Sequence, residues 1–321
     1  MEYLISVVVP IYNSAPYIGE LINSLIKQTK SNFEIVFIDD NSNDSSETLV
    51  KKLLMDADIA FTYIYLDINV GPGMARNRAL QAVKGDYILF VDSDDWLAIN
   101  TMAILNEAIN AYDFDLLLFD YIRAWNNGKR KPCKELNLPE GFINPSFYAA
   151  LTNDGVTRKL FNRKIIFENN IEFPNWRNGE DIAFSITYVS FVDKIYYLNE
   201  YLYNYLQREN SISNQNIIAS DFYNDLYKIY LKYFDGDTFQ EYRIVQDLLY
   251  NQPLLYLKTR QNYKKIKKYL TNLMESNKGI IKNINMHYFN YTKRIFIYAA
   301  YFRLVLVLKF LWFIKNKFME G

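Results

Sequence analysis

Apolar runs and amphipathic stretches alternate through the first 120 or so residues of the chain. Unbroken apolar runs rich in β-branched residues are typical of strands buried on both faces of a sheet. Such a run occurs at residues 4–11, and further strands are predicted at residues 34–38, 59–66, 87–91 and 116–121. Segments with apolar residues at helical spacing lie between them, at residues 17–28, 48–55, 72–83 and 101–112. This alternation predicts an α/β domain with a mostly parallel, doubly wound sheet.

The rest of the chain follows a different pattern. Gly and Pro are frequent in residues 122–145, so we expect this stretch to be irregular. A mixed stretch continues to about Ser213, and from Asp221 onward the apolar spacing is helical. We therefore predict an α/β domain at residues 1–215 and a mainly helical C-terminal region at residues 216–321.

Composition narrows the class of protein. Half of the 321 residues are hydrophobic, which is enough for a large core and excludes a disordered chain. The single cysteine, Cys133, excludes an intramolecular disulfide and favours a reducing compartment. The apolar run near the N-terminus is short and lacks a preceding basic region, so we interpret it as a strand and not a secretory signal. These features predict a cytoplasmic protein.

The formal net charge of zero conceals an asymmetry. Residues 258–321 hold 14 Lys and Arg against two Glu, a net charge of +12, so the rest of the chain carries −12. A basic end on an acidic body indicates a partner such as anionic lipid or nucleic acid. No recognised nucleic-acid motif accompanies the charge, which disfavours nucleic acid.

The C-terminal tail combines apolar and basic residues. Residues 293–318 read KRIFIYAAYFRLVLVLKFLWFIKNKF, which is long enough to span a membrane. Arg303 and Lys309 interrupt this segment, and a charge at mid-bilayer costs roughly 2.5–3.5 kcal/mol. We predict instead a peripheral association of the tail with the cytoplasmic membrane face, helped by the lysines of residues 264–268. An ordinary helical subdomain and an oligomer interface are the alternatives.

Polar clusters follow three of the predicted strands. Tyr12 and Asn13 follow the first strand, Asp39 and Asp40 the second, and residues 92–95 (Asp-Ser-Asp-Asp) the fourth. Sheets of this type bind ligands at the carboxyl ends of their strands. Converging acids repel one another unless a cation offsets the charge, and Mg²⁺ or Mn²⁺ prefers oxygen ligands together with substrate phosphates. A metal–diphosphate site is therefore predicted, with capping of turns and helices as the alternative.

Five segments occur together in order: VVVPIYN, EIVFIDDNSND, NVGPGMARNRAL, GDYILFVDSDD and NGEDIAF. Together they resemble glycosyltransferase family 2, a group of inverting enzymes with a GT-A fold, over roughly residues 6–213. The later segment YLYNYLQRENSIS is similar to members that build capsule, exopolysaccharide or cell-wall glycans. The resemblance implies transfer of a hexose or N-acetylhexosamine from a UDP-sugar to a hydroxyl of a lipid-linked or surface glycan, with Mn²⁺ or Mg²⁺ as cofactor.

The same resemblance assigns the nucleotide site. Pro10 and Tyr12 match the segment whose aromatic ring packs on uracil, and Asp40 matches the acid that accepts a hydrogen bond from uracil N3–H. Cytosine N3 carries no hydrogen, so this contact would select uracil. Asp92 matches the acid near the ribose, and its neighbour Ser93 is assigned to the same site.

The resemblance also assigns the reacting groups. Asp94 matches the metal ligand, and Arg76 matches the arginine close to the diphosphate or to Asp92. Asp181 matches the catalytic base, and Glu180 its neighbour near the acceptor. At a helix start the dipole would lower the pKa of Asp181, whereas burial would raise it. Arg208 is a candidate for supporting the diphosphate when a loop closes.

Several further residues are open to two interpretations. Trp96 and Trp176 flank the acidic motifs and are candidates for stacking on a sugar of the acceptor. Of Arg76 and Arg78, one is expected to be only a solvated charge. Asp95 has no role implied by the resemblance and is interpreted as a cap of the next helix.

Other functions fit the sequence less well. A nicotinamide dehydrogenase needs a Gly-x-Gly-x-x-Gly turn after its first strand, where this chain has residues 10–14, Pro-Ile-Tyr-Asn-Ser. A glycoside hydrolase needs two opposed carboxylates and no nucleotide site. A non-catalytic nucleotide-sugar-binding protein would keep Tyr12 and Asp40 but could dispense with Asp181.

Overall fold

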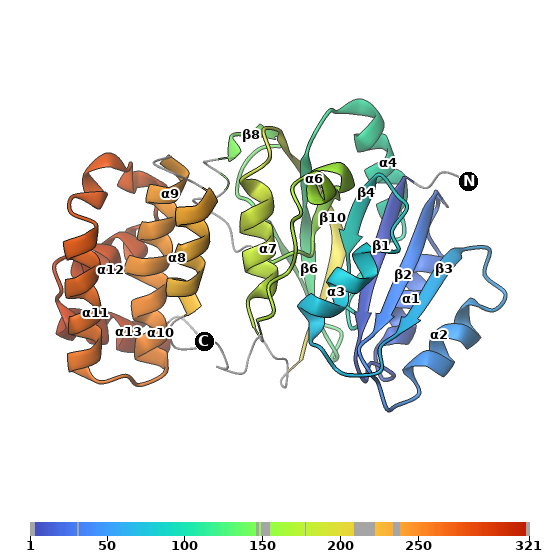
Figure 1. The fold of residues 1–321 in the computed structure, drawn as a ribbon, viewed down its shortest axis with the longest axis horizontal. Coiled ribbons are helices and arrows are strands. Elements are labelled where there is room, and N and C mark those ends of the chain that lie inside the picture. Colours follow the sequence, from blue (N-terminus) through green and yellow to red (C-terminus); the bar gives the residue numbers. More distant parts are fainter. Residues whose placement is uncertain are drawn as a thin grey trace. The chain divides into compact units, whose positions relative to one another are not determined.

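The computed structural model describes residues 4–30, 32–145, 148, 155–176, 178–208, 222–233 and 238–318 (Figure 1). These residues form two compact units. The first contains residues 4–145 and 155–208, and the second contains residue 148 and residues 222–318. The predicted boundary between residues 215 and 216 lies outside the described residues.

Four parallel strands form one half of the sheet. In spatial order they are β3 (Ala60–Tyr65), β2 (Phe33–Asp39), β1 (Ile5–Ile11) and β4 (Tyr87–Phe90). Every residue of β2 is buried, as expected for an apolar run covered on both faces. The register pairs Val8 with both Val36 and Phe90, so β1 lies at the centre of this half.

Helices connect these strands as predicted. They are α1 (Ile18–Ile26), α2 (Ser46–Leu54), α3 (Pro72–Leu80) and α4 (Thr101–Ala111). Helix α1 buries Ile18, Leu21, Ile22 and Leu25, the positions that helical spacing indicates. Helix α3 begins with a proline at its first turn, where the missing N–H has no intrahelical partner to lose.

The other half of the sheet is mixed in direction. The strand order continues from β4 through β9 (Lys159–Asn162), β6 (Leu116–Trp125) and β10 (Ile195–Gln207) to β5 (Trp96–Leu97). Strand β9 runs antiparallel to both of its neighbours, whereas β6 and β10 are parallel to each other. The predicted α/β class and GT-A arrangement are confirmed.

The expectation that residues 122–145 are irregular is wrong. Strand β6 continues to Trp125 and turns through Gly128 into β7 (Arg130–Cys133), and β8 (Gly141–Ile143) pairs with β10. Gly128 has φ +82°, a conformation that favours glycine. Pro132 is tolerated because β7 pairs only with β6 and is therefore an edge strand. Charged edge residues hide the alternation by which a strand is recognised in a sequence.

An aromatic cluster holds α7 (Glu180–Val189) against the sheet. The rings of Phe173 and Phe184 stack with centroids 4.0 Å apart, and Phe90 of β4 meets both of them edge on. Phe161 of β9 joins the same cluster. This packing fixes the N-terminus of α7 relative to the carboxyl end of β4, where the acidic segment begins.

The second unit is helical, as predicted. Its main elements are α8 (Phe222–Tyr233), α9 (Thr238–Arg243), η2 (Ile244–Asn251), α10 (Gln252–Lys258), α11 (Tyr263–Ser276), α12 (Tyr291–Tyr301) and α13 (Val305–Phe318). Short 3₁₀ turns, η3 (Ile280–Asn283) and η4 (Met286–Tyr288), connect α11 to α12. The unit has its own apolar core, which includes Leu248, Leu270 and Ile297. A buried ion pair joins Arg243 to Asp247 at 2.9 Å.

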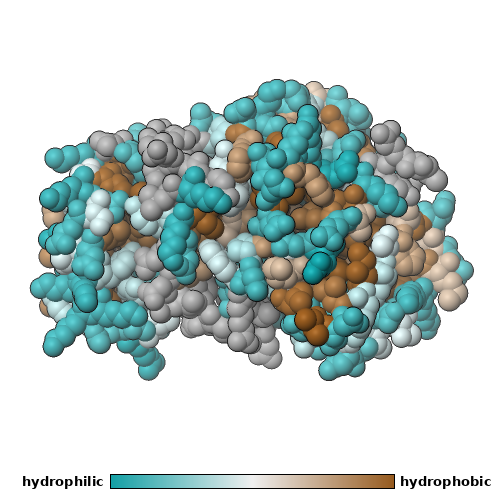
Figure 2. All heavy atoms as spheres, viewed as in Figure 1, coloured by the Kyte–Doolittle hydropathy of each residue, from teal (hydrophilic) through white to brown (hydrophobic). Residues whose placement is uncertain are grey.

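The tail is not one continuous helix. It divides into α12 and α13 at Arg303, which has φ +60°. Helix α13 buries Val305 and Leu308 but leaves other apolar side chains exposed. Among the described residues, no helix has both the length and the apolar character needed to cross a membrane. Figure 2 shows one face of the molecule, on which hydrophilic side chains and hydrophobic patches are interspersed in both units.

Candidate active site

The loops after β1 and β2 are tied to each other. The Asn13 N–H donates to Ser42 Oγ at 2.9 Å, and the Asn43 N–H donates to Asn13 Oδ1 at the same distance. Asn13 has φ +49°, in the left-handed region that asparagine tolerates. Pro10 lies near the end of β1, and the Tyr12 side chain beyond it is 53% exposed. The predicted uracil-stacking residue is thus an exposed ring next to a loop that is held by hydrogen bonds.

Asp40 is buried at the end of β2 and organises the loop before α3. Its two carboxylate oxygens accept the N–H groups of Val70 at 2.7 Å and Gly71 at 2.8 Å. Asn69 donates to the Asp40 carbonyl at 3.0 Å. A carboxylate oxygen can accept more than one hydrogen bond, so Asp40 retains capacity for a further donor such as an imide N–H.

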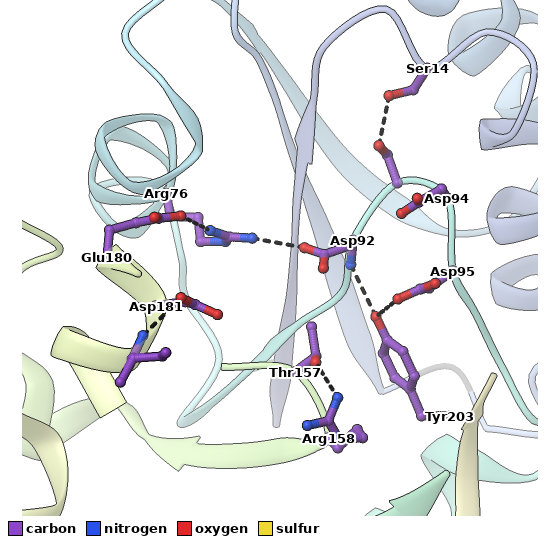
Figure 3. A network of polar contacts seen from close by, with 12 residues as sticks. Ser14, Arg76, Asp92, Asp94, Asp95, Thr157, Arg158, Glu180, Asp181 and Tyr203 are labelled. Carbon is purple, nitrogen blue, oxygen red and sulfur yellow. Dashed lines mark hydrogen bonds and ion pairs between the residues drawn. The ribbon is translucent and has the colours of Figure 1, made fainter. Parts of the chain in front are cut away.

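The four residues of the acidic segment diverge after β4 (Figure 3). Asp92 accepts from Arg76 Nη2 at 2.7 Å, and Ser93 Oγ lies 2.6 Å from Ser14 Oγ. Asp94 forms an ion pair with Arg208. Burial raises the pKa of Asp94, and the nearby charge of Asp92 adds to the increase. Each carboxylate in the segment therefore has a separate environment.

Asp95 has a structural role that the sequence did not reveal. Its carboxylate is buried and accepts from the Tyr203 hydroxyl at 2.6 Å and from the Leu206 N–H at 2.8 Å. The Tyr203 hydroxyl in turn accepts from the Asp92 N–H at 3.3 Å. The interpretation of Asp95 as a helix cap is wrong, because α4 has Asn100 at its N-cap. Asp95 instead joins the acidic segment to β10.

Arg76 links the acidic segment to α7. Its guanidinium is buried, with Nη2 2.7 Å from Asp92 and Nη1 3.5 Å from Glu180 (Figure 3). The neighbouring Arg78 is exposed and is the solvated charge that was expected. The close approach of α3 to α7 depends on Gly73, where an added Cβ would lie 2.5 Å from Glu180 Cγ. A side chain at this position would push Glu180 away from Arg76.

Asp181 lies in the first turn of α7, on the other side of Asp92 from Asp94 (Figure 3). A Cβ added to Gly155 would lie 3.3 Å from Asp181 Oδ2, so the chain passes close beneath the carboxylate. The Gly155 carbonyl accepts from Lys159 Nζ and from Ser185 Oγ. Lys159 is fully buried, and its charge lies near Asp181. No motif or spacing in the sequence indicates Gly155 or Lys159.

Burial decides the protonation of the two acids on α7. It raises the pKa of Glu180 to about 7, the neighbouring Asp181 charge adds to the shift, and Arg76 opposes it. Burial also raises the pKa of Asp181, against the opposing charge of Arg76. The pKa of both acids is therefore raised, in the direction that burial favours.

The aromatic candidates flank this arrangement. Trp96 lies in β5, two residues after Asp94, with the Arg130 guanidinium 4.8 Å from its ring centre. Trp176 is partly buried and precedes α7. The Arg208 guanidinium lies 4.6 Å from the Tyr17 ring centre, so it is held between this ring and Asp94.

The acidic segment supplies oxygen ligands of the kind that Mn²⁺ and Mg²⁺ prefer. Within the described residues, no group of three or more His, Cys, Asp or Glu side chains converges to hold a metal ion. The two acids at the open side, Asp92 and Asp94, fit a divalent ion only where a second ligand source such as a diphosphate completes its coordination.

The structure combines an α/β fold with buried acids beside the acidic segment. Comparison with known proteins identifies the class of protein that has these features. The family model described as glycosyl transferase family 2 matches residues 6–167. GlyG of Streptococcus pneumoniae serotype 4, a glycosyltransferase, is 29% identical over 229 residues, which cover 66% of this chain and 73% of GlyG.

TarS of Staphylococcus aureus, a poly(ribitol-phosphate) beta-N-acetylglucosaminyltransferase, is 29% identical over 238 residues, which cover 72% of this chain and 41% of TarS. Crystal structures of TarS residues 1–349 with UDP and with UDP-GlcNAc match this fold with TM-scores of 0.73 and 0.72. The UDP complex is 22% identical and covers 98% of this chain and 91% of that chain.

The mannosyltransferase PcManGT of Pyrobaculum calidifontis, in complex with GDP-Man and Mn²⁺, matches with a TM-score of 0.58 at 14% identity, covering 100% of this chain and 89% of that chain. The chain belongs to glycosyltransferase family 2. The predicted family and enzyme class are confirmed.

The raised pKa of Glu180 makes stability depend on pH. The folded carboxyl titrates at about 7 and the unfolded one near its ordinary 4.5, so its contribution to stability is full at low pH and is lost as pH rises through 7. Glu180→Gln removes this loss. We therefore expect the free energy of unfolding of Glu180→Gln, minus that of the wild type, to be about 1–3 kcal/mol larger at pH 8 than at pH 5.

Urea denaturation at the two pH values measures this difference. Glu172→Gln is the control, because it removes the same type of carboxylate from an exposed position. An identical difference between variant and wild type at both pH values would contradict the assigned environment of Glu180.

Proposed function

We propose that this chain transfers a hexose or N-acetylhexosamine from a UDP-sugar to a hydroxyl of a polymeric glycan, with inversion at the anomeric carbon. The observation that carries the proposal is the arrangement of Asp181 and Asp94 on opposite sides of Asp92 (Figure 3). The UDP and UDP-GlcNAc complexes of TarS support a uridine nucleotide as donor. The polymer named in the TarS description supports a polymeric acceptor.

The acceptor oxygen forms a bond to the anomeric carbon while the bond from that carbon to the UDP oxygen breaks. Asp181 takes the proton of the attacking hydroxyl. A base works best when its pKa lies near the working pH, and the burial that raises the pKa of Asp181 moves it in that direction. Glu180 lies beside the base and near the acceptor, where its carboxyl can hydrogen-bond a sugar hydroxyl.

Uridine would lie over the loops after β1 and β2. Tyr12 offers an exposed ring for stacking, and Asp40 offers a carboxylate whose position is fixed by two backbone N–H groups. Asp92 and Ser93 would face the ribose. Trp96 and Trp176 are the candidate surfaces for the acceptor sugars.

Mn²⁺ or Mg²⁺ would be held by Asp94, with Asp92 nearby and the donor diphosphate supplying further oxygens. When bound, such an ion offsets the negative charge that develops on the leaving UDP. Arg208 pairs with Asp94 in this structure. In our proposal, Arg208 turns from Asp94 to the diphosphate when the donor binds.

A non-catalytic nucleotide-sugar-binding protein is the alternative. Such a protein needs a uridine site but has no use for a buried carboxylate next to the sugar. Leaving Asp181 and Glu180 in a desolvated position costs stability, because burial disfavours their charged forms. Retention of this cost favours catalysis, and turnover with a panel of acceptors separates the two functions.

Asp181→Asn tests the base. It keeps the shape of the side chain but cannot take a proton, so we expect transfer from UDP-GlcNAc to fall by about 10²–10⁴-fold. UDP affinity, measured by calorimetry, should stay unchanged, because Asp181 is assigned to the acceptor side. The exposed Asp193→Asn is the control. Full transfer by Asp181→Asn would remove Asp181 from the proposed reaction.

Asp94→Ala tests the metal site. We expect the increase in UDP affinity on addition of Mn²⁺ to fall by roughly 10–100-fold or more, since the proposed direct ligand is lost. Titration of UDP with and without Mn²⁺ measures this. The exposed Asp56→Ala should keep the full Mn²⁺ effect. An undiminished Mn²⁺ effect in Asp94→Ala would show that the ion binds elsewhere.

We further propose that the second unit binds the cytoplasmic face of the membrane through α13. Leu306, Phe310 and Phe313 are 70%, 62% and 55% exposed, and their spacing of four and three residues places them on one helical face. Lys309 is exposed beside them. An exposed apolar stripe with flanking basic residues is typical of helices that lie at an anionic lipid surface.

Leu306→Gln with Phe310→Gln tests the membrane proposal. We expect the double variant to lose binding to vesicles containing phosphatidylglycerol in a flotation assay, because the apolar contact is removed while the basic charge is kept. Met55→Gln with Ile68→Gln is the matched control, since these side chains are 76% and 69% exposed in the first unit. Equal flotation of both double variants would refute α13 as the contact.

A further inference from the structure

The hairpin formed by the end of β6 and by β7 is strongly basic. Residues 121–134, the basic hairpin, contain five cations and no acidic residue: Arg123, Lys129, Arg130, Lys131 and Lys134. All five side chains are exposed. Residues 1–211 carry 19 Lys and Arg against 28 Asp and Glu, a net charge of −9, so this hairpin is a local exception on an acidic unit.

Among the described residues, the five cations contact mainly neutral groups. Within the described part of the chain, none of them has an ion pair with a carboxylate. Lys134 Nζ donates to the amide oxygen of Asn199 at 3.0 Å. Arg130 and Lys129 instead lie over aromatic rings, those of Trp96 and Trp125. Cations held in this way remain available to an anion from outside.

One cross-strand pair makes the arrangement costly. Arg123 of β6 lies directly opposite Lys131 of β7 in the antiparallel register. Like charges in directly opposed positions destabilise a sheet. A bound anion between the two side chains would convert this repulsion into two attractions, so the pair is better explained by a ligand than by stability.

The base of the hairpin is rigid. Asp120 is buried and accepts from the Glu135 N–H at 2.7 Å and from the Tyr197 hydroxyl at 2.7 Å. Glu135 forms an ion pair with Arg158 at 2.8 Å, and the Arg158 guanidinium lies 4.6 Å from the Tyr121 ring centre. The basic side chains therefore project from a fixed platform, which lowers the entropy lost on binding.

The platform adjoins the candidate active site at two points. Arg130 lies over Trp96, which is two residues beyond Asp94. At the other point, Arg158 packs on Tyr121 and its charge lies near Tyr203, whose hydroxyl accepts from the Asp92 N–H. A chain lying along the basic hairpin would therefore pass close to the acidic segment of the candidate active site.

We propose that the basic hairpin binds the acceptor, and that the acceptor is a polymer joined by phosphodiester links. The inference rests on the proposed glycosyl transfer, because it concerns where the attacking hydroxyl comes from. Guanidinium and ammonium groups form charge-assisted hydrogen bonds with phosphate oxygens. A phosphodiester chain presents one negative charge per repeat beside free hydroxyls, whereas a neutral glycan would gain little from five unpaired cations.

The test is a triple variant, Lys129→Gln, Arg130→Gln and Lys131→Gln, in the full chain. Its matched control is Lys27→Gln, Lys30→Gln and Lys84→Gln, which removes the same charge from exposed positions of the first unit. Binding is measured by calorimetry with poly(ribitol phosphate), polygalacturonate and neutral dextran, and by flotation with phosphatidylglycerol vesicles. Thermal melting checks that both variants are folded.

We expect the hairpin variant to bind poly(ribitol phosphate) about tenfold more weakly than the control variant, because three exposed charge contacts are lost. Added salt should weaken the wild type more than the variant. UDP binding with Mn²⁺ should be equal in all three proteins, which separates this inference from the proposed function. Absence of UDP binding in the wild type would instead overturn the proposed function.

Three results would overturn the inference. The first is equal affinity of both triple variants for poly(ribitol phosphate). The second is tighter binding of polygalacturonate than of poly(ribitol phosphate) by the wild type, which would indicate a carboxylate polymer. The third is loss of vesicle binding by the hairpin variant with unchanged polymer binding, which would make the hairpin a lipid contact.

Discussion

The buried guanidinium of Arg76 is the interaction on which the rest of the candidate site depends. It lies between Asp92 and Glu180, and its charge also reaches Asp181. Without it, three carboxylates from two different elements would share a desolvated region with Lys159 as the remaining nearby cation. Removing one partner of a buried ion pair typically costs about 3–5 kcal/mol. Arg76 therefore permits α7 to bring its two acids to the end of β4.

A second constraint keeps the acidic segment in place from the opposite side. Asp95 binds the Tyr203 hydroxyl and the Leu206 N–H, and the same hydroxyl contacts the Asp92 N–H. Strand β10 thus positions the backbone of the segment, while Arg76 positions one of its side chains. With the backbone fixed, the carboxylate of Asp94 pairs with Arg208 and not with Arg76. The stability of the segment and its availability for a ligand are supplied by different residues.

The parallel half of the fold was predictable because each element has one dominant signal. The strands of residues 4–11 and 34–38 are mostly apolar, and helical spacing marks α1. The antiparallel strands of the other half were missed. Strand β7 is a charged edge strand, and the buried residues of these strands contact partners that are distant in the sequence. Asp181 and Arg76 were found through motifs, whereas Gly155 and Lys159 act only through proximity, which no spacing in the chain reveals.

Charge distribution adds a further constraint on how such a protein can handle anionic ligands. Residues 1–257 carry −12, so a nucleotide diphosphate approaching this part of the chain meets an unfavourable field at long range. At physiological ionic strength this field is screened beyond ~8 Å, and contacts within that distance decide binding. Three cations near the acidic segment make contacts within this distance. Arg76 contacts Asp92, Arg208 contacts Asp94, and Arg130 contacts Trp96. An acidic unit can therefore hold anions at the end of its sheet because its short-range cations are concentrated there.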